Sequence, residues 1–388
     1  MRANYGEPLR RFLKDQKILE IVDFGDLQVF ENATTYPCIL ITNNSTSIDD
    51  KFKVTIPKTL NFSSLDEYVI QNSFLVSKIH LQNEGWNLAS ETEQNLVKKI
   101  KLAGTPLGEY LNHRILYGIK TGYNDAFVID EATKDYFIQE NKEYSHILKP
   151  FLGGRDIKRY QPLSSNKYLI LFPKGFTNKH RPISQSPWKW LQEEYPIIAK
   201  HLEPFQSKCE KRSDKGDYWW ELRACDYYDD FESPKIILPD IAIKMQATYD
   251  LEGFYCVNTA YIIPTEEKFL LAILNSKLIH YYYSKISSSI RGGYLRFIRQ
   301  YLEDIPIKEN CKDKSEIKEI IENIIRLNNE LNITKLSATQ SHIESKVAFF
   351  EDKLDSILYS EYGLTYEEIQ IIENSIVGFA STFKSRTS

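Results

Sequence analysis

The sequence predicts a mixed α/β fold of the α+β type. Short apolar runs alternate with Gly, Pro and Asn between residues 110 and 308, a pattern typical of short, partly exposed strands. Isoleucine and leucine recur at three- and four-residue steps after Pro306, as they do along amphipathic helices. The chain has 388 residues, of which 42% are hydrophobic and 26% charged. This is the composition of a globular protein long enough for two domains.

The first part of the chain is expected to hold a helix and two strands. Apolar side chains recur at roughly helical spacing over residues 8–20. The continuous apolar runs ILEIVDF (18–24) and YPCILIT (36–42) suit strands that are buried on both faces of a sheet. Residues 45–75 are polar and are expected to form a connecting segment. The stretch ETEQNLVKKIKLAG (91–104) predicts a further helix.

The middle of the chain predicts several short strands around one longer helix. The strands are expected at AFVID (126–130), YLILF (168–172), KIILPDIAI (235–243) and AYIIP (260–264). The helix is expected at KFLLAILNSKLIHYYY (268–283). Together they predict a mixed α/β domain.

An acidic, helical section is expected after Pro306, with two amphipathic helices separated by a Ser/Thr-containing break. These changes of character predict four sections, namely 1–60, a connector at 61–109, the mixed domain at 110–308 and the helical section at 309–388. The apolar positions of the two helices are Ile317, Ile320, Ile321, Ile324 and Leu331, followed by Ile343, Val347, Phe350, Leu354 and Ile357.

The cysteines and the apolar runs indicate a reduced, soluble protein. The five cysteines are widely spaced and none forms a CxxC pair, which argues against a disulfide framework and against a zinc cluster. The N-terminal residues lack the apolar region of a signal peptide, and no run approaches the length of a membrane span. We therefore expect a cytoplasmic location and no membrane partner.

The charge is unevenly distributed. The net charge is −4, but residues 149–223 contain 15 Lys and Arg against 8 Asp and Glu, a local balance of +7. A basic region on an acidic protein can still bind a polyanion, because the local field matters more than the total. Aromatic residues make up 13% of the chain, which fits stacking surfaces for bases and large cores equally well.

Patterns for independent catalysis are weak or missing. GIKTG at 118–122 ends like a phosphate-binding loop, but that loop requires glycine before the lysine and the residue is Ile119. Pro239-Asp240 and Glu266-Glu267-Lys268 fit the letters of a magnesium-dependent nuclease, yet Glu266 follows the end of a predicted strand. The seven histidines form no HExxH motif. We predict neither a catalytic residue nor a metal site.

Four blocks combine glycine turns with cations, namely 117–130, 148–160, 211–223 and 287–307. Such turns expose donors to phosphates and base edges, and neighbouring aromatic rings can stack on bases. The candidate DNA-binding residues are Lys120, Thr121, Tyr123, Asn124, Arg155, Lys158, Arg159, Arg212, Lys215, Arg223, Arg291, Arg296 and Arg299.

Each block also has a purely structural interpretation. The first fits a plain Gly/Asn turn before a strand, and the second fits a surface turn in which Asp156 pairs locally. The tryptophans of the third block, Trp219 and Trp220, favour a core position beside cations that make contacts. The fourth fits a basic helix face.

Taken in this order, the blocks resemble the C-terminal specificity domain of type IIG restriction–modification enzymes and TaqI-like adenine-N6 DNA methyltransferases. The opening YGEPLRRFL…ILEIVDFGDLQVFENATTYPCILI looks like the last helix and strands of the family's methyltransferase domain. The resemblance covers residues from about 110 to 374 and is carried by GIKTGYNDAF, KPFLGGRDIKRY, RSDKGDYWWELR, PKIILPDIA, NTAYII, LLAILNSKL, RGGYLRFIRQYLEDIPI and LTYEEIQIIE.

The resemblance implies sequence-specific recognition of double-stranded DNA for a restriction–modification system. Residues 1–60 would be the C-terminal remnant of a Rossmann-like methyltransferase sheet, and 110–308 the target-recognition domain. In the family, the catalytic domain flips the target adenine out of the duplex. The Gly-rich turn for S-adenosylmethionine and the (N/D)PP(Y/F) turn are missing here, and no Pro-Pro pair occurs.

We therefore expect the catalytic half to be absent from this chain, and no cofactor to bind it. S-adenosylmethionine is expected only in a catalytic partner, a methyltransferase subunit or domain. The DNA hypothesis requires the cationic loops between Lys120 and Arg299 to converge on one groove. Two alternatives stay open: a non-catalytic protein–protein assembly module acting through the sheet edge at 18–42 and the C-terminal helices, and an enzyme in its own right.

Overall fold

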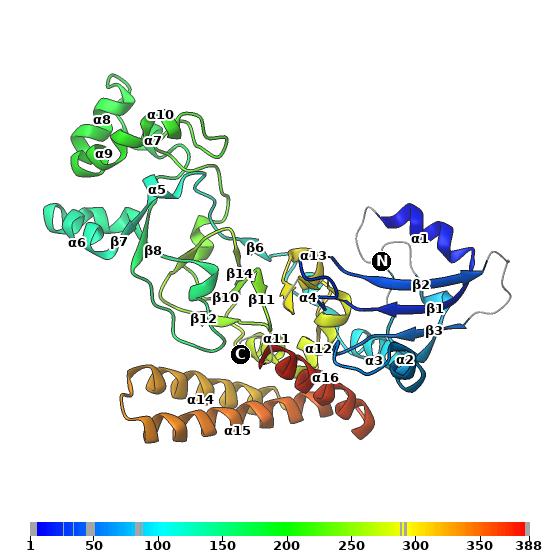
Figure 1. Cartoon of the computed structure of the whole chain (residues 1–388). Helices are drawn as coiled ribbons and strands as arrows, with labels where there is room; N and C mark the ends of the chain where they lie inside the picture. Colours follow the sequence, from blue (N-terminus) through cyan, green and yellow to red (C-terminus); the bar gives the residue numbers. More distant parts are fainter. Residues whose placement is uncertain are drawn as a thin grey trace. The chain divides into compact units, whose positions relative to one another are not determined.

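The computed structural model describes residues 6–384 apart from 26, 34, 44–50, 82–85, 87, 288 and 291–292. Helices and small sheets are mixed along the chain, so the expected α/β fold class is confirmed (Figure 1). The chain divides into two compact units that each combine separate stretches. Unit 1 comprises Met1–Tyr110, Ser276–Lys312 and Asp355–Ser388, and unit 2 comprises Leu111–Asn275 and Asp313–Leu354.

This division differs from the contiguous sections predicted from the sequence. The first boundary falls beside residue 110 in both, but residues 276–312 group with the N-terminal stretch and 313–354 group with the middle of the chain. Sequence patterning reports local periodicity and carries no signal for such long-range grouping. The two units are described separately below.

Unit 1 begins with α1 (Glu7–Lys14) and a four-stranded sheet in the order β2-β1-β3-β4. β1 is antiparallel to β2 and parallel to β3, and β3 is antiparallel to β4. One sheet face packs on a small core that includes Ile18, Phe52, Val54 and Trp86. The strands are β1 (Lys17–Asp23), β2 (Cys38–Asn43), β3 (Lys51–Thr55) and β4 (Phe74–Ser77).

Both apolar runs in this part are strands, as expected, but the expected burial on both faces is wrong for β2. β2 is an edge strand, and the side chains of Ile39 and Ile41 are 41% and 45% exposed. The stretch 8–20, in which helical spacing was expected throughout, contains two elements, because α1 ends at Lys14 and β1 begins at Lys17. Residues 45–75 are also more than a connector, since they include β3 and α2 (Leu65–Asn72).

The expected helix at 91–104 is confirmed as α3 (Glu91–Leu102). It begins at a capping box in which Ser90 and Glu93 exchange side-chain to backbone hydrogen bonds. Lys285 of α12 (Lys277–Ile286) pairs with Glu93 at 2.7 Å, which ties α12 to the start of α3 within unit 1. The remaining described elements of unit 1 are η2 (Lys78–His80), β5 (Thr105–Pro106), α4 (Leu107–Tyr110), β15 (Ser289–Ile290), β16 (Tyr294–Arg296), α13 (Arg299–Leu302), β17 (Pro306–Ile307) and α16 (Tyr366–Lys384).

Unit 2 contains two four-stranded sheets, ordered β12-β10-β14-β6 and β13-β8-β9-β7. The four expected strand runs lie here, although AFVID begins inside the short helix α5 (Asn124–Phe127). The strands are β6 (Leu116–Tyr117), β7 (Val128–Asp130), β8 (Leu148–Leu152), β9 (Lys167–Ile170), β10 (Lys235–Pro239), β11 (Ile241–Ala242), β12 (Thr248–Asp250), β13 (Tyr255–Cys256) and β14 (Ala260–Pro264).

Short helices gather at one end of unit 2 (Figure 1). Aromatic and aliphatic residues from these helices share one large core with the sheet of β8 and β9. The short helices are α6 (Glu131–Glu140), α7 (Phe176–His180), α8 (Pro187–Glu194), α9 (Pro196–Leu202) and α10 (Gln206–Cys209). Unit 2 also has 3-10 turns at η3 (Lys142–Ile147), η4 (Gly154–Asp156), η5 (Glu203–Phe205) and η6 (Tyr228–Phe231).

The long helix expected at 268–283 is two helices. α11 (Phe269–Asn275) ends before Ser276, whose hydroxyl accepts a hydrogen bond from the backbone of Ile279 and starts α12. An N-cap serine inside an apolar run breaks the helix without changing its periodicity.

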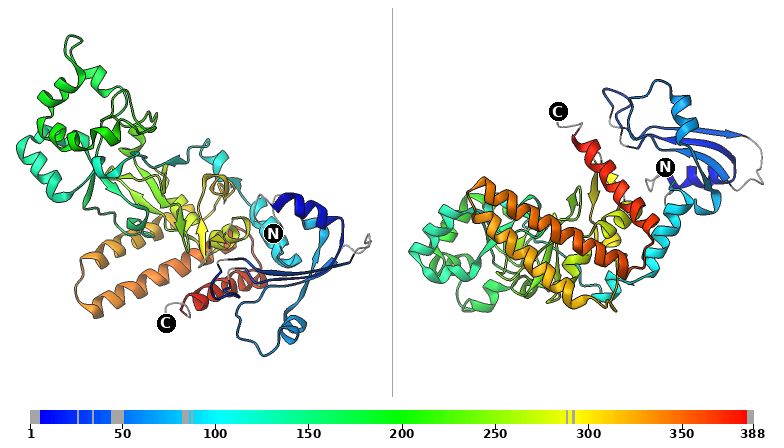
Figure 2. Two further views of the ribbon diagram at one scale, coloured as in Figure 1. Left: turned by 45° about the horizontal axis from the view of Figure 1, so that its top comes forward. Right: turned by 90° about the horizontal axis from the view of Figure 1, so that it is seen from below.

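The described part of the C-terminal section, up to residue 384, contains three helices where two were expected. α14 (Lys314–Ile333) and α15 (Ser337–Glu361) match the two predicted periodic runs, and α16 is additional. Figures 1 and 2 show α14 and α15 side by side as an antiparallel hairpin. Within the described residues, no helix has the length and apolar character needed to cross a membrane.

A buried ion pair lies in the sheet of unit 2. Lys235 of β10 and Asp250 of β12 are opposite one another, with 2.5 Å between Nζ and Oδ2 and with side chains 0% and 1% exposed. Lys235 also donates to the carbonyl of Phe231, and Asp250 accepts from the backbone N–H groups of Glu252 and Phe254. Every charge is therefore balanced and hydrogen-bonded, as burial requires.

Candidate nucleic-acid interface

The first glycine block is fitted closely onto a neighbouring segment. Gly118 and Ile119 donate backbone hydrogen bonds to Ala260 and Cys256, and a Cβ at Gly118 would lie 2.1 Å from the carbonyl oxygen of Val257. Gly122 has a φ of +73°, a left-handed backbone that glycine adopts without strain. The plain turn inferred as an alternative is thus present, and it leaves Lys120 and Asn124 exposed.

Arg212 of the third block joins this turn from inside the protein. Its guanidinium donates to the backbone carbonyls of Thr121, Trp219 and Glu221 and lies 4.3 Å from the ring centre of Phe127. The residue is only 8% exposed. The sequence placed Arg212 among the DNA contacts, but in the structure it holds two loops together and does not face solvent.

The cations beside Arg212 do face solvent. Lys120 and Arg223 flank the same carboxylate, Asp214, at 2.9 and 3.6 Å, and their side chains are 51% and 47% exposed. The hydrogen bond from Lys120 is the largest cause that lowers the pKa of Asp214, and it keeps the carboxylate ionised. Two cations share one anion here, so this group of three side chains carries one excess positive charge.

Tyr123 and Asn124 are held by polar contacts at the same turn. The hydroxyl of Thr121 is buried and donates to Oδ1 of Asn124 at 2.5 Å. Lys208 of α10 donates to the Tyr123 hydroxyl at 3.0 Å, with its Nζ 5.4 Å from the centre of that ring. Thr121 therefore acts as a support for Asn124, while Tyr123 and Lys208 form a ring and a cation at the surface.

The second block forms a turn that is closed by its own aspartate. Asp156 accepts a hydrogen bond from the backbone of Gly153 at 2.7 Å, so the local pairing considered from the sequence is present. Arg155 and Lys158 are exposed. Arg159 is not, because its side chain is 14% exposed and lies 3.2 Å from Glu351.

One short segment, Cys256–Ala260, connects the first two blocks. A Cβ at Gly154 would lie 2.9 Å from the carbonyl oxygen of Thr259, just as Gly118 is fitted against Val257. Asn258, between them, is exposed and donates its backbone N–H to Ile119. The first three blocks are therefore neighbours in unit 2.

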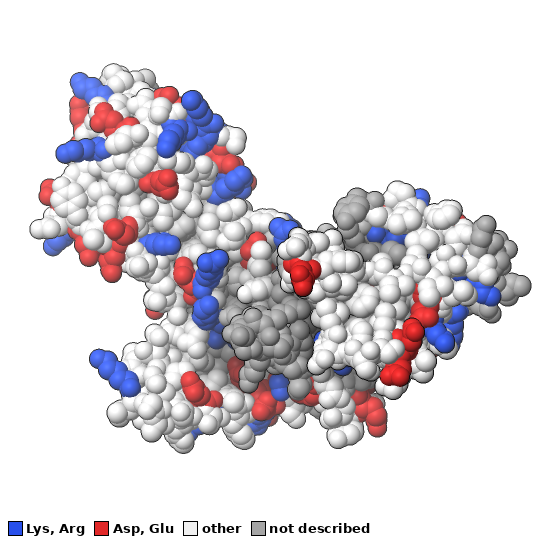
Figure 3. Space-filling model, in the orientation of Figure 1, with Lys and Arg blue, Asp and Glu red and all other residues white. Residues whose placement is uncertain are grey.

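Figure 3 shows basic side chains of unit 2 near α10 and beside the sheet of β10, β12 and β14, with some acidic side chains among them. Lys215 of the third block is exposed and donates to the carbonyl of Glu210. Sequence reasoning did not single out Lys208 or the exposed pair Asn258 and Thr259. The latter two stand in NTAYII, a run already noted, where a polar pair before a buried strand was a usable signal.

The two tryptophans of the third block are in the core, as favoured from the sequence. Trp219 and Trp220 are buried, and Tyr218 stacks on Trp220 with ring centres 4.8 Å apart. Glu221 is fully buried, and its carboxylate accepts hydrogen bonds from the backbone of Gly175, Thr177 and Asp217. This packing fixes the loop from which Arg223 emerges.

The fourth block belongs to unit 1. Arg291 lies outside the described residues, Arg296 is exposed on β16, and Arg299 of α13 pairs with Glu303 at 2.8 Å. Convergence of these arginines with the first three blocks on one groove stays a prediction. Among the described residues, no group of three or more His, Cys, Asp and Glu is arranged to hold a metal ion.

Comparison with known proteins adds the following. Residues 149–307 match the TaqI-like C-terminal specificity domain. The type II methyltransferase M.BstVI of Geobacillus stearothermophilus is 23% identical over 97% of this chain and 64% of its own length. The type II restriction enzyme and methyltransferase RM.Eco57I of Escherichia coli is 21% identical over 90% of this chain and 38% of its own length.

One solved structure has the same fold. The type IIL restriction–modification enzyme MmeI in complex with DNA aligns with a TM-score of 0.58 at 15% sequence identity, over 97% of this chain and 47% of the MmeI chain. The chain thus spans less than two thirds of the length of each protein compared here.

Proposed function

We propose that this chain recognises the sequence of double-stranded DNA for a type II restriction–modification system, since residues 149–307 match the TaqI-like C-terminal specificity domain. The observation that carries the proposal is that three glycine and cation blocks are neighbours. The first two meet on Cys256–Ala260, and Arg212 joins the third block to the first. Cations and polar side chains from distant parts of the sequence are exposed together there. Such a surface suits a polyanion with readable edges.

The residues of this surface fall into two chemical classes. Lys120, Lys208 and Arg223 are flexible or partly paired cations, suited to phosphate contacts that set the register on the duplex. Asn124, Asn258 and Arg155 are exposed groups that can form paired hydrogen bonds with base edges in the major groove. On binding, phosphate replaces Asp214 as the partner of Lys120 and Arg223.

The finer proposal is that the chain serves an adenine-N6 methyltransferase of the type IIG kind. The order of the sequence blocks supports it, and so do the methyltransferase names of the relatives. In this proposal, methyl transfer to a flipped adenine takes place on a methyltransferase partner or domain. S-adenosylmethionine binds there and not to these 388 residues, because they lack the Gly-rich turn that holds this cofactor in the family. They also lack a Pro-Pro pair for the (N/D)PP(Y/F) turn that orients the target adenine.

We expect selection from random-sequence duplexes to enrich one motif, and the affinity for it to fall steeply with salt. Each of Lys120→Gln and Arg223→Gln should reduce the slope of log affinity against log salt by about 0.9, and should weaken all sequences alike. Fluorescence anisotropy between about 50 and 200 mM salt measures this. Lys142→Gln, an exposed lysine of η3, is the matched control and should leave the slope unchanged.

Two results count against the proposal. One is no duplex binding at about 50 mM salt, either alone or with a methyltransferase partner. The other is equal slopes for the Lys120, Arg223 and Lys142 variants, because the surface would then make no specific set of phosphate contacts.

A second candidate function is assembly with another protein. The exposed edge strand β2 presents Ile39 and Ile41, and α1 presents Leu9 and Phe12 at 55% and 62% exposure. Open strand edges and apolar side chains tend to find partners. This surface suits the methyltransferase partner or domain of the first proposal.

We expect the chain to form complexes through β2, and Ile41→Lys to abolish them without loss of folded protein. Light scattering during size-exclusion chromatography, with and without a methyltransferase partner, measures the mass. Ile70→Lys, on the exposed face of α2, is the control. A monomer that stays monomeric at all concentrations and with that partner excludes this function.

A further inference from the structure

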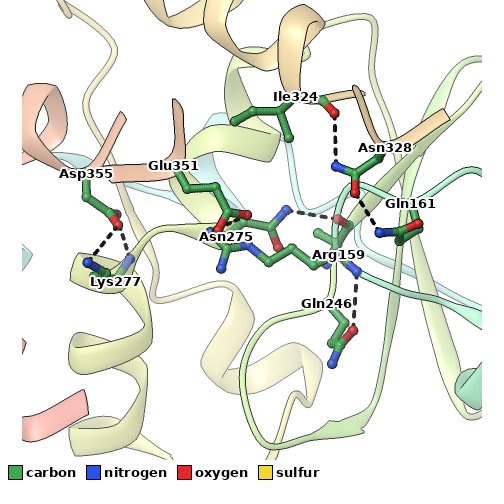
Figure 4. A network of polar contacts seen from close by, with 10 residues as sticks. Arg159, Gln161, Gln246, Asn275, Lys277, Ile324, Asn328, Glu351 and Asp355 are labelled. Atoms are coloured by element: carbon green, nitrogen blue, oxygen red, sulfur yellow. Dashed lines mark hydrogen bonds and ion pairs between the residues drawn. The ribbon is translucent and has the colours of Figure 1, made fainter. Parts of the chain in front are cut away.

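The second block is tied to the C-terminal hairpin of unit 2 by polar contacts (Figure 4). Arg159 lies 3.2 Å from Glu351 of α15, with side chains 14% and 25% exposed. Gln161 donates to Oδ1 of Asn328 on α14 at 2.6 Å, and the amide of Asn328 donates back to the carbonyl of Ile324 in the same helix. Both helices of the hairpin therefore hold the segment that follows Arg155 and Lys158.

The backbone of this segment is strained where the contacts concentrate. Tyr160, between Arg159 and Gln161, has a φ of +56°, a left-handed conformation that is rare for a bulky residue, and its ring is buried. Its N–H donates to the carbonyl of Ala247 at 3.1 Å. A strained residue persists only where its surroundings over-determine it.

A second loop completes the support. Asn275 exchanges two hydrogen bonds with the backbone of Ala247, and the Thr248 hydroxyl donates to the carbonyl of Gln161 at 2.7 Å. Gln246 accepts from the backbone N–H of Arg159. Arg159, Tyr160 and Gln161, which directly follow the turn of Arg155 and Lys158, are thus clamped between residues 246–248 and the hairpin.

We propose that the α14–α15 hairpin is a positioning element for sequence recognition, and that Arg159 acts as a positioning residue through Glu351. Arg159 does not touch DNA; it fixes the turn so that Arg155 and Lys158 meet the duplex in one orientation. This inference rests on the proposed DNA-reading function and deepens it. It departs from the sequence-based assignment of Arg159 as a DNA contact, and the two assignments predict opposite results.

Three variants separate them: Arg159→Gln, Glu351→Gln and the double variant. Glu344→Gln is the matched control, since Glu344 is exposed on α15 two turns before Glu351 and its change removes the same charge. The measurements are affinity for the selected motif, affinity for a scrambled duplex and the salt dependence of each. Backbone hydrogen exchange over residues 153–161 is measured in the free protein.

If Arg159 positions the turn, each single variant lowers the ratio of motif to scrambled affinity by about tenfold, roughly the effect of one mismatched base pair. The double variant is no worse than either single variant, because one interaction is lost in all three. The salt slope is unchanged, and exchange at 153–161 becomes faster. Loss of stability alone would not produce this pattern, because it would weaken both duplexes equally.

If Arg159 contacts phosphate directly, Glu351→Gln frees its guanidinium and tightens binding, while Arg159→Gln lowers the salt slope by about 0.9. Either result overturns the inference. So does hydrogen exchange at 153–161 that matches the Glu344→Gln control. The exchange experiment needs no DNA, so it tests the hairpin's hold on residues 153–161 separately from duplex binding. A protein without duplex affinity would refute the proposed function, even if faster exchange in the variants showed that the hairpin fixes these residues.

Discussion

Replacing Lys235 by alanine is expected to lower the free energy of unfolding by about 3 to 5 kcal/mol. The lysine and Asp250 are both fully buried, 2.5 Å apart, in the sheet of β10, β12 and β14. Removal of the ammonium leaves a carboxylate in the core with only two backbone donors, Glu252 and Phe254. The cost comes from this uncompensated charge more than from the lost attraction.

Urea unfolding followed by far-ultraviolet circular dichroism measures the effect. Lys314→Ala is the matched control, because Lys314 and Glu267 are 3.0 Å apart but both are more than 40% exposed. Such a surface pair is expected to contribute at most about 1 kcal/mol. The double variant Lys235→Met with Asp250→Leu should recover most of the lost stability, since no charge then stays buried. Equal losses for the Lys235 and Lys314 variants would contradict this account.

Arg212→Met is expected to cost about 3 kcal/mol of stability and to weaken duplex binding of the remaining folded protein. Its guanidinium satisfies several carbonyl oxygens from two loops, and a buried acceptor left without a donor costs about 1 to 3 kcal/mol. Without it, the turn of Lys120 is no longer fixed to the loop of Arg223. A residue that never meets DNA would thus affect binding.

The control is Arg223→Met, which removes the same charge from an exposed position. That variant is expected to unfold like the wild type while losing salt-dependent affinity. Arg212→Lys should fail to rescue Arg212→Met, because an ammonium cannot reach the separate carbonyls that a planar guanidinium spans. Full stability of Arg212→Met, or full rescue by lysine, would show that the loops are held by other contacts.

Local elements of the fold were predictable because their signals are local. AYIIP is β14 from its first residue to its last, and α3 begins at the serine and glutamate of its capping box. The break at Ser276 was missed because the apolar period continues through it, and the exposure of β2 was missed because a sequence shows no neighbouring strand. Patterning describes what a segment prefers, while burial depends on what covers it.

The candidate site was predictable in its residue types and not in its geometry. Lys120, Arg155 and Arg223 are exposed, as expected from turns rich in glycine and charge. Arg212 and Arg159 stand in the same blocks but are buried or paired, and sequence gives them the same appearance as the others. Only the fold distinguishes an arginine that holds a loop from one that meets a ligand.

The close fit of Gly118 and Gly154 against Cys256–Ala260 bears on how this protein can diverge. A single methyl group at either glycine meets a main-chain carbonyl oxygen, so substitution of either glycine is strongly disfavoured. Exposed side chains beside it, such as Arg155 and Asn258, can be exchanged at little cost to folding. If the proposed function holds, the side chains assigned to base contacts can therefore change one at a time while the main chain beneath them keeps its fold.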